Sequence, residues 1–243
     1  MDMSQLQSDW ERFGDADPMW AILSDPSKRG SWDPVQFFAS GRGQVQGVMA
    51  TVDQKYPGLS HGDALDFGCG LGRLTQPLAE LFQRAVGVDI SEPMVVQARQ
   101  LNQAGDRCQF VHNTRADLQQ FPDESFDLVY SHIVLQHIPQ PFTKAYLAEF
   151  RRVLRPGGVA TFTLPSHPAP TLRGTVYRLL PFGLINAYKR RRDGALMAMH
   201  SIRRTHLEAH LRSVGFQVDD VVQDSSGGPN WVSYRYFVSR GAD

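Results

Sequence analysis

Three glycines at alternate positions follow an apolar run that ends in an acid. Residues 64–73 read Ala-Leu-Asp-Phe-Gly-Cys-Gly-Leu-Gly-Arg, with the glycines at positions 68, 70 and 72. Glycine has no side chain to keep a ligand from the backbone, and it adopts turn conformations that other residues avoid. The amide groups of such a turn, ahead of a helix, form an electropositive cradle. The pattern predicts a strand, a tight turn and a helix start that bind a nucleoside-type ligand.

A second acid ends the next apolar run. Asp89 follows Ala-Val-Gly-Val at 85–88, about twenty residues after the glycine turn. This spacing fits one strand–helix–strand unit, in which the second acid is placed to accept hydrogen bonds from both hydroxyls of a ribose. Such charge-assisted bonds contribute roughly 1.5–3 kcal/mol each.

The glycine spacing separates two kinds of cofactor. A dinucleotide fold has its third glycine three positions after the second, where this chain has Arg73. The pattern from Asp66 to Gly72 resembles the first motif of class I S-adenosylmethionine-dependent methyltransferases, and Val88-Asp89 resembles their acidic ribose-binding position. The segment FPDESFDLVYSHIVLQHI at 121–138 is also similar to the ubiquinone-methyltransferase-like members of that family. The resemblance implies S-adenosyl-L-methionine as the cofactor, rather than NAD.

The resemblance also implies a set of cofactor-binding positions. Thr114 stands where the family often has an acid beside the adenine, and Asp117 comes three positions late. Met94 follows Ser91, a predicted helix cap, and fits either adenine contact or core packing. The cofactor-binding residues that we expect are Asp66, Gly68, Cys69, Gly70, Arg73, Asp89, Ile90, Met94, Asn113, Thr114, Arg115 and Ser131.

Two histidines follow the predicted strand 126–131 and are the candidate catalytic residues. Methyl transfer from a sulfonium is an in-line displacement, so the protein mainly orients a nucleophile, which supplies roughly 7–11 kcal/mol. A base is needed only when the nucleophile holds its proton tightly. His132 lies directly after the strand, where it is expected to act as a base, orient the substrate or contact the cofactor. For His137, either a catalytic part or a role in holding the local turn remains open.

The other histidines carry no metal pattern. His206 and His210 are four residues apart, but a zinc-protease motif requires a glutamate directly after the first histidine, and here it is Glu208. We therefore expect no metal. His167 and His200 flank a proline-rich segment and are candidates for substrate contact.

Composition limits the function classes. The 243 residues carry 25 basic and 25 acidic side chains, a balance that argues against a nucleic-acid partner. The polar start and the absence of a long apolar run predict a cytoplasmic protein with no integral membrane segment. Cys69 and Cys108 are expected to be reduced and buried.

The order of elements predicts an α/β fold with a Rossmann-like, mostly parallel sheet. Strands are expected near 64–67, 85–90, 108–112, 126–131 and 159–164, with helices between them. An amphipathic helix is predicted from Phe142 to Leu154. The segments 215–222 and 231–238 predict a closing antiparallel hairpin, with the second strand at the sheet edge.

One segment precedes the predicted domain of residues 59–243, and another is inserted within it. Residues 1–58 are aromatic and contain three Asp-Pro pairs typical of helix starts, so we expect short helices that form an N-terminal lid, or a plain covering of the sheet edge. Residues 165–200 are expected to form a substrate cap after the fifth strand. The basic run 189–192 within it is read as a solvated surface, an anion contact or a peripheral membrane contact.

Three functions follow from these patterns. The first is a methyltransferase acting on an oxygen, less readily a nitrogen or carbon, of a natural-product, glycan or lipid-like small molecule. The second is an S-adenosylmethionine-binding protein with a non-methylating role, and the third, which the glycine spacing disfavours, is an NAD-type oxidoreductase.

Overall fold

A computed structural model describes residues 2–179, 191 and 195–241. The helices are α1 (Met3–Ala16), α2 (Pro18–Ile22), η1 (Pro26–Lys28), α3 (Pro34–Lys55), α4 (Thr75–Leu81), α5 (Glu92–Gln100), η2 (Gly105–Arg107), η3 (Leu135–His137), α6 (Gln140–Val153), α7 (Leu172–Leu179) and α9 (Arg204–Ser213). The strands are β1 (Asp63–Phe67), β2 (Arg84–Asp89), β3 (Cys108–His112), β4 (Phe126–Ser131), β5 (Leu154–Pro168), β6 (Gln217–Asp224) and β7 (Trp231–Ser239).

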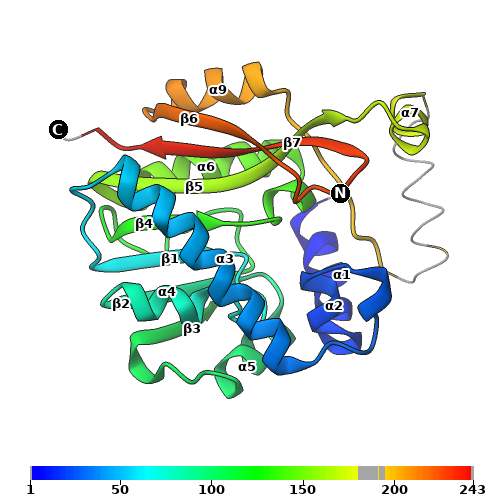
Figure 1. The fold of residues 1–243 in the computed structure, drawn as a ribbon, viewed down its shortest axis with the longest axis horizontal. Coiled ribbons are helices and arrows are strands. Elements are labelled where there is room, and N and C mark those ends of the chain that lie inside the picture. The colour runs from blue at the N-terminus through cyan, green and yellow to red at the C-terminus, as the bar shows by residue number, and fades with distance from the viewer. Residues whose placement is uncertain (1, 180–190, 192–194, 242–243) are drawn as a thin grey trace.

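All the described strands form one sheet in the order β3-β2-β1-β4-β5-β7-β6 (Figure 1). β1 to β5 are parallel, and β7 runs antiparallel to both β5 and β6. The strand order reverses between β1 and β4, and ligands of such sheets bind at the carboxyl ends of the strands beside this reversal. The predicted mostly parallel sheet with a closing hairpin is confirmed.

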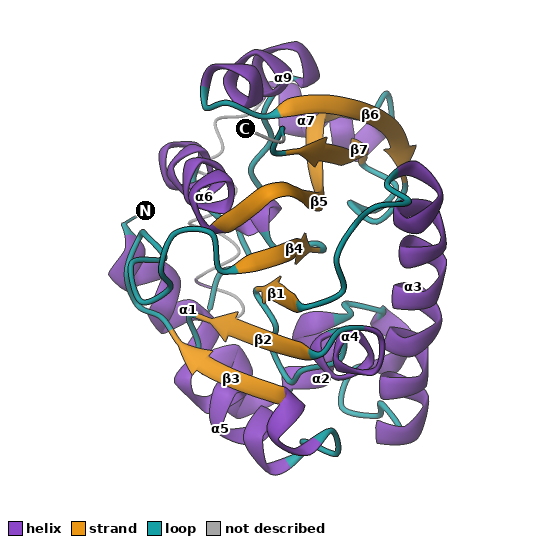
Figure 2. Cartoon of the chain, turned by 90° about the vertical axis from the view of Figure 1, so that its left-hand side faces the viewer, coloured by secondary structure: helices purple, strands orange, loops and turns teal. Residues whose placement is uncertain are grey.

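Helices cover both sides of the sheet, and the central strands β1 and β4 are buried (Figure 2). Successive side chains of a strand point to opposite faces. In β1, Ala64 packs with α3, α4 and α5, whereas Leu65 and Phe67 pack with α6. The near-continuous apolar runs of the sequence therefore become central strands between two helical layers.

The three Asp-Pro pairs begin helices as predicted. The carboxylates of Asp17, Asp25 and Asp33 accept hydrogen bonds from the second or third backbone amide after them, and so cap α2, η1 and α3. A proline at the first helical position costs no hydrogen bond there and fixes a helical backbone angle.

Three expectations need correction. The N-terminal helices are not all short, because α3 has 22 residues and packs Val45, Met49 and Val52 against the sheet. β7 is not the edge strand: it lies between β5 and β6, with its central side chains buried. The fifth strand is longer than predicted, since β5 continues to Pro168 and pairs with β7 along its whole second half.

Much of the basic run 189–192 lies outside the described residues. Among the helices of the described ranges, none combines the length and the apolar character needed to cross a membrane.

Candidate active site

The glycine turn follows β1 and has the backbone conformation that glycine favours. Gly68, Gly70 and Gly72 all have positive φ, at +79°, +50° and +79°. A Cβ on Gly70 would lie 2.5 Å from the Cδ1 atom of Ile22, and one on Gly68 would lie 2.3 Å from a methyl of Val134. Any side chain at these positions would be strained and would also displace its neighbours.

Asp89 at the end of β2 faces the glycine turn. One carboxylate oxygen accepts the backbone N–H of Gly70 at 2.8 Å, and the other accepts that of Ser91 at 2.9 Å. A carboxylate has about four acceptor positions, so Asp89 keeps acceptor capacity for a further donor. The side chain is half-buried, and its backbone partners fix the carboxylate beside the turn.

A first cavity lies at the carboxyl ends of the central strands. It encloses about 720 Å³ of empty space including its open mouth. The predicted cofactor residues that line it are Gly68, Gly70, Asp89, Ile90, Met94 and Asn113. They come from the end of β2, from the segments that directly follow β1, β2 and β3, and from α5.

The N-terminal helices contribute to the same cavity. Met3, Leu6 and Trp10 of α1 and Ile22 of α2 line it. Trp10 also packs edge-on against His137, with ring centroids 5.2 Å apart. Residues of this N-terminal segment therefore form part of the cavity wall.

Four of the predicted cofactor residues lie behind the cavity lining. Asp66 is 1% exposed and accepts the Thr75 hydroxyl at 2.6 Å, and burial raises its pKa to about 7. Arg73 is also buried and donates to Gln44 of α3 at 2.8 Å. Cys69 is buried without a disulfide, and Ser131 donates to the Phe67 carbonyl at 3.0 Å. These side chains therefore make contacts within the protein around the glycine turn.

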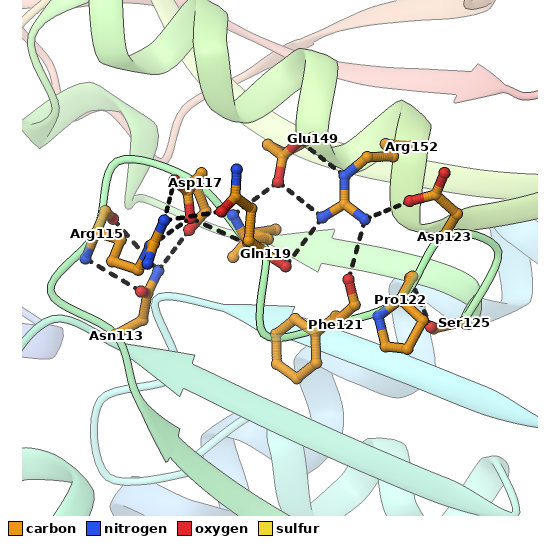
Figure 3. Close-up of polar contacts among 11 residues, drawn as sticks. Asn113, Arg115, Asp117, Gln119, Phe121, Pro122, Asp123, Ser125, Glu149 and Arg152 are labelled. Carbon is orange, nitrogen blue, oxygen red and sulfur yellow. Dashed lines mark hydrogen bonds and ion pairs between the residues drawn. The ribbon is translucent and has the colours of Figure 1, made fainter.

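Of the three predicted cofactor residues in the loop after β3, one lines the cavity and two are exposed. Asn113 is buried and lines the cavity, and its amide donates to the carbonyl of Asp117 at 2.9 Å. Thr114 and Arg115 are exposed, and Arg115 pairs with Asp117 at 2.9 Å (Figure 3). Within the described residues, Thr114 and Arg115 are not part of the cavity lining.

A polar network fastens this loop to α6. Glu149 accepts the backbone N–H of Leu118 at 2.8 Å and pairs with Arg152 at the same distance (Figure 3). Arg152 also donates to the carbonyls of Leu118 and Phe121 and pairs with Asp123. Arg152 thus holds the second half of the loop, from Leu118 to Asp123, against α6.

A second cavity adjoins the first at the end of β4. Its empty space is about 1060 Å³ including open solvent, and Ala21, Ile22, His132, Ile133 and His137 line both cavities. The remaining wall comes from distant segments: Leu23, Ser24, Asp25, Trp32, Gln136, Met197, Met199, Ser226, Gly227 and Gly228.

The backbone after His132 has an unusual conformation. Ile133 has a φ of +55°, which is a steric outlier for a β-branched residue. Its backbone N–H donates to the hydroxyl of Thr163 on β5 at 2.9 Å. Strained conformations of this kind cost about 1–3 kcal/mol and cluster at functional sites.

His137 is buried and has contacts at both ring nitrogens. Nδ1 donates to the carbonyl of Ala198 at 2.7 Å, and Nε2 lies 3.2 Å from the amide nitrogen of Gln136. Burial lowers its pKa to about 4. These contacts join η3 to the segment that carries Met197 and Met199, which agrees with the holding role that sequence reasoning considered for it.

Sequence reasoning missed Arg235, which lies beside His132. Its Nη2 is 3.2 Å from Nδ1 of His132, and it pairs with Asp224 at 3.1 Å. One signal was present: Arg235 alternates with Trp231, Ser233 and Phe237, which makes it a charged residue on the buried face of a strand.

In comparison with known proteins, residues 65–162 match a family model described as a methyltransferase domain. A solved structure of magnesium protoporphyrin IX methyltransferase from Synechocystis PCC 6803, with bound S-adenosylhomocysteine, aligns over 99% of this chain and 100% of its own, with a TM-score of 0.67 and 21% identity. Residues 65–162 are thus similar to the methyltransferase domain family, and the chain has the fold of the class I S-adenosylmethionine-dependent methyltransferases. The resemblance drawn from the sequence motifs is thereby confirmed.

The chain matches its curated relatives over only part of their length. Malonyl-[acyl-carrier protein] O-methyltransferase of Salmonella typhimurium is 35% identical over 108 residues, which are 44% of this chain and 40% of that relative. A ubiquinone biosynthesis O-methyltransferase of Pseudomonas syringae pv. tomato is 29% identical over 165 residues, 65% of this chain and 66% of the relative. The chain thus spans less than two thirds of the length of these two relatives.

The residues of the first cavity fit the family's cofactor. The turn at Gly68 and Gly70 leaves no room for a Cβ, and the free acceptor positions of Asp89 suit a ribose diol. Within the described residues, no group of three or more His, Cys, Asp or Glu side chains is placed to hold a metal ion.

Proposed function

We propose that this methyltransferase transfers a methyl group from S-adenosyl-L-methionine to an oxygen of a small molecule with an apolar body. The observation that carries the proposal is the meeting of two cavities at His132 and Ile133. The first cavity has the glycine turn and Asp89, and the second has apolar walls that include Trp32, Met197 and Met199. An acceptor in the second cavity would approach the end of β4, where a methyl group bound in the first cavity can be reached.

The chain's own residues perform the positioning in this reaction. Asp89 and the glycine-turn amides would hold the ribose and the amino-acid part of the cofactor, and Asn113 and Met94 line the rest of its cavity. When bound, the cofactor supplies a methyl group on a positively charged sulfur, which is already activated. Orienting an acceptor atom in line with that sulfur accounts for roughly 7–11 kcal/mol of the barrier.

Two measurements test this function. Titration calorimetry with S-adenosylhomocysteine is expected to show binding at one site. Incubation with methyl-labelled cofactor and an extract of small bacterial metabolites is expected to give a labelled product. Binding without any labelled product would favour the alternative of a non-methylating protein on the same fold.

A matched variant separates the two cavities. Met199→Trp fills the second cavity without touching the first, so affinity for S-adenosylhomocysteine should stay within about twofold while product formation falls at least about tenfold. Unchanged product formation with the second cavity filled would mean that the acceptor does not use it.

A further inference from the structure

His132 has one ring nitrogen that is already engaged. The guanidinium of Arg235 lies 3.2 Å from Nδ1 through Nη2. A guanidinium donates hydrogen bonds and never accepts them, so Nδ1 must accept and can carry no proton. A neutral imidazole has a single N–H, and in His132 that N–H is therefore at Nε2.

Arg235 is itself fixed in place. It is 8% exposed, and its Nε and Nη2 lie 3.2 and 3.1 Å from one carboxylate oxygen of Asp224. Asp224 is in turn held by the backbone N–H of Ser226 at 2.8 Å. These contacts run from β6 through β7 to His132 and hold Arg235 against Nδ1. Nδ1 therefore remains the accepting nitrogen of the imidazole.

The groups around His132 favour its neutral form. Arg235 from β7 and Arg73 from the glycine turn are cationic, whereas Asp224 from β6 is anionic. Tyr130 of β4 stacks on the ring at an interplanar angle of 12°. Burial and the charge of Arg235 outweigh Asp224 and lower the pKa of His132.

Other ionisable groups that line the second cavity offer no base. His137 has contacts at both of its nitrogens within the protein. Asp25 accepts hydrogen bonds from Ser27, which lower the pKa of its carboxyl and make it a weaker base. Within the described residues, the lining of this cavity contains no further Asp, Glu, His, Lys or Tyr.

We infer that His132 acts as a hydrogen-bond donor through Nε2–H, and that the acceptor is a carboxylate, which needs no base. This inference rests on the proposed methyl transfer. A carboxyl group with a pKa near 4 is fully ionised at neutral pH, whereas a phenol near 10 is not. One carboxylate oxygen accepts Nε2–H, and the other forms the bond to the methyl carbon as the carbon–sulfur bond breaks and its electron pair stays on sulfur. A methyl ester and a neutral thioether result, and no proton remains to be removed.

The proton position can be observed without any acceptor. Long-range ¹H–¹⁵N spectra of the labelled protein should show His132 with a protonated Nε2 and no titration between about pH 5.5 and 8. The signal is assigned by its loss in His132→Gln. Arg235→Met removes the donor and should let the proton populate Nδ1 as well as Nε2, while the exposed control Arg107→Met should leave the spectrum unchanged. A protonated Nδ1, or a titration of the wild-type ring near pH 6.5, would overturn the donor role.

Variants of His132 separate a donor from a base. An amide can donate a hydrogen bond but is no base, so His132→Gln should retain turnover within about tenfold of wild type, whereas His132→Leu should lose about 10²–10³-fold, as when one such donor is removed. Equal losses in both variants would contradict the inference. Turnover should also be independent of pH between about 6 and 8.5, and a rise with a midpoint near 6.5 would indicate a histidine base.

The bond formed identifies the acceptor class. The acceptors to test are the metabolite extract and a probe set of C8–C16 fatty acids and arylacetic acids with their matched alcohols and phenols. The labelled product should release labelled methanol in mild alkali, because methyl esters hydrolyse under these conditions. Alkali-stable label would mean a methyl ether or amine and would overturn the carboxylate. If S-adenosylhomocysteine binds but nothing is labelled, the proposed function fails, and the spectra still decide the donor role of His132.

Discussion

The two cavities of this protein are built in different ways. In the first, the glycine turn and Asp89 belong to one local β1–α4–β2 unit. The second combines α2, η3, residues 197–199 and the loop between β6 and β7. A local unit can be recognised by its spacing, whereas a site assembled from distant segments has no spacing to recognise. The sequence therefore predicts the glycine turn and Asp89 of the first cavity, but it does not predict the second cavity.

The largest expected effect tests the local unit at Gly70. Gly70→Val adds a β-branched side chain at a positive φ, where it would also meet Ile22. Affinity for S-adenosylhomocysteine should fall more than about a hundredfold, corresponding to about 2.7 kcal/mol or more. Gly43→Val is the control, because a Cβ there meets nothing within 4 Å. Equal affinities of the two variants in calorimetry would remove the turn from the binding site.

The second prediction concerns the stability of the strand beneath the turn. Burial raises the pKa of Asp66 from 3.8 to about 7, although the Thr75 hydroxyl opposes this shift. The folded state thus holds the proton more tightly than the unfolded state, so this stabilisation is complete below about pH 4 and is lost as the pH rises to about 7. Relative to Asp66→Asn, the wild-type free energy of unfolding should fall by about 2–4 kcal/mol over this range.

Urea unfolding at several pH values measures this difference. Asp106→Asn, at an exposed position, should give a curve parallel to the wild type. Parallel curves for Asp66→Asn as well would show that Asp66 is ionised in the folded protein.

The third prediction tests Asp89 as the ribose acceptor. Asp89→Ala removes an ionised acceptor and should weaken S-adenosylhomocysteine binding about ten- to a hundredfold, or about 1.5–3 kcal/mol. The exposed Asp106→Ala serves as the control in the same calorimetric titration. A change of less than about twofold in folded Asp89→Ala would place the ribose elsewhere.

The smallest expected effect asks whether residues 1–58 behave as a lid. Trp10 and Ile22 line the first cavity, so opening this segment would expose a bound ligand. If opening releases the ligand, S-adenosylhomocysteine at ten times its dissociation constant should slow proteolysis within residues 1–58 by up to about tenfold. Cleavage near the exposed Arg107 is the internal control. Unchanged cleavage despite binding would leave a plain covering of the sheet edge.

Part of the fold was predictable from local chemistry. The alternation of apolar runs and helices predicted the parallel sheet, and the Asp-Pro pairs predicted the starts of α2, η1 and α3. The position of β7 was not predictable in this way. Its alternating pattern fits an edge strand as well as a strand between β5 and β6, because periodicity does not reveal how many neighbours a strand has.

The candidate site also has residues that the sequence predicts and contacts that only the structure reveals. By itself, the sequence determined the glycine turn, Asp89 and the position of His132 after a strand, because these depend on backbone conformation and on spacing within a few elements. Only the tertiary structure decided which nitrogen of His132 carries a proton. That choice depends on Arg235, which lies 103 residues further along the chain and reaches His132 only because β7 inserts beside β5. Buried electrostatic contacts act over a few ångströms in space, whatever the distance along the chain, and so they become visible only once the sheet is assembled.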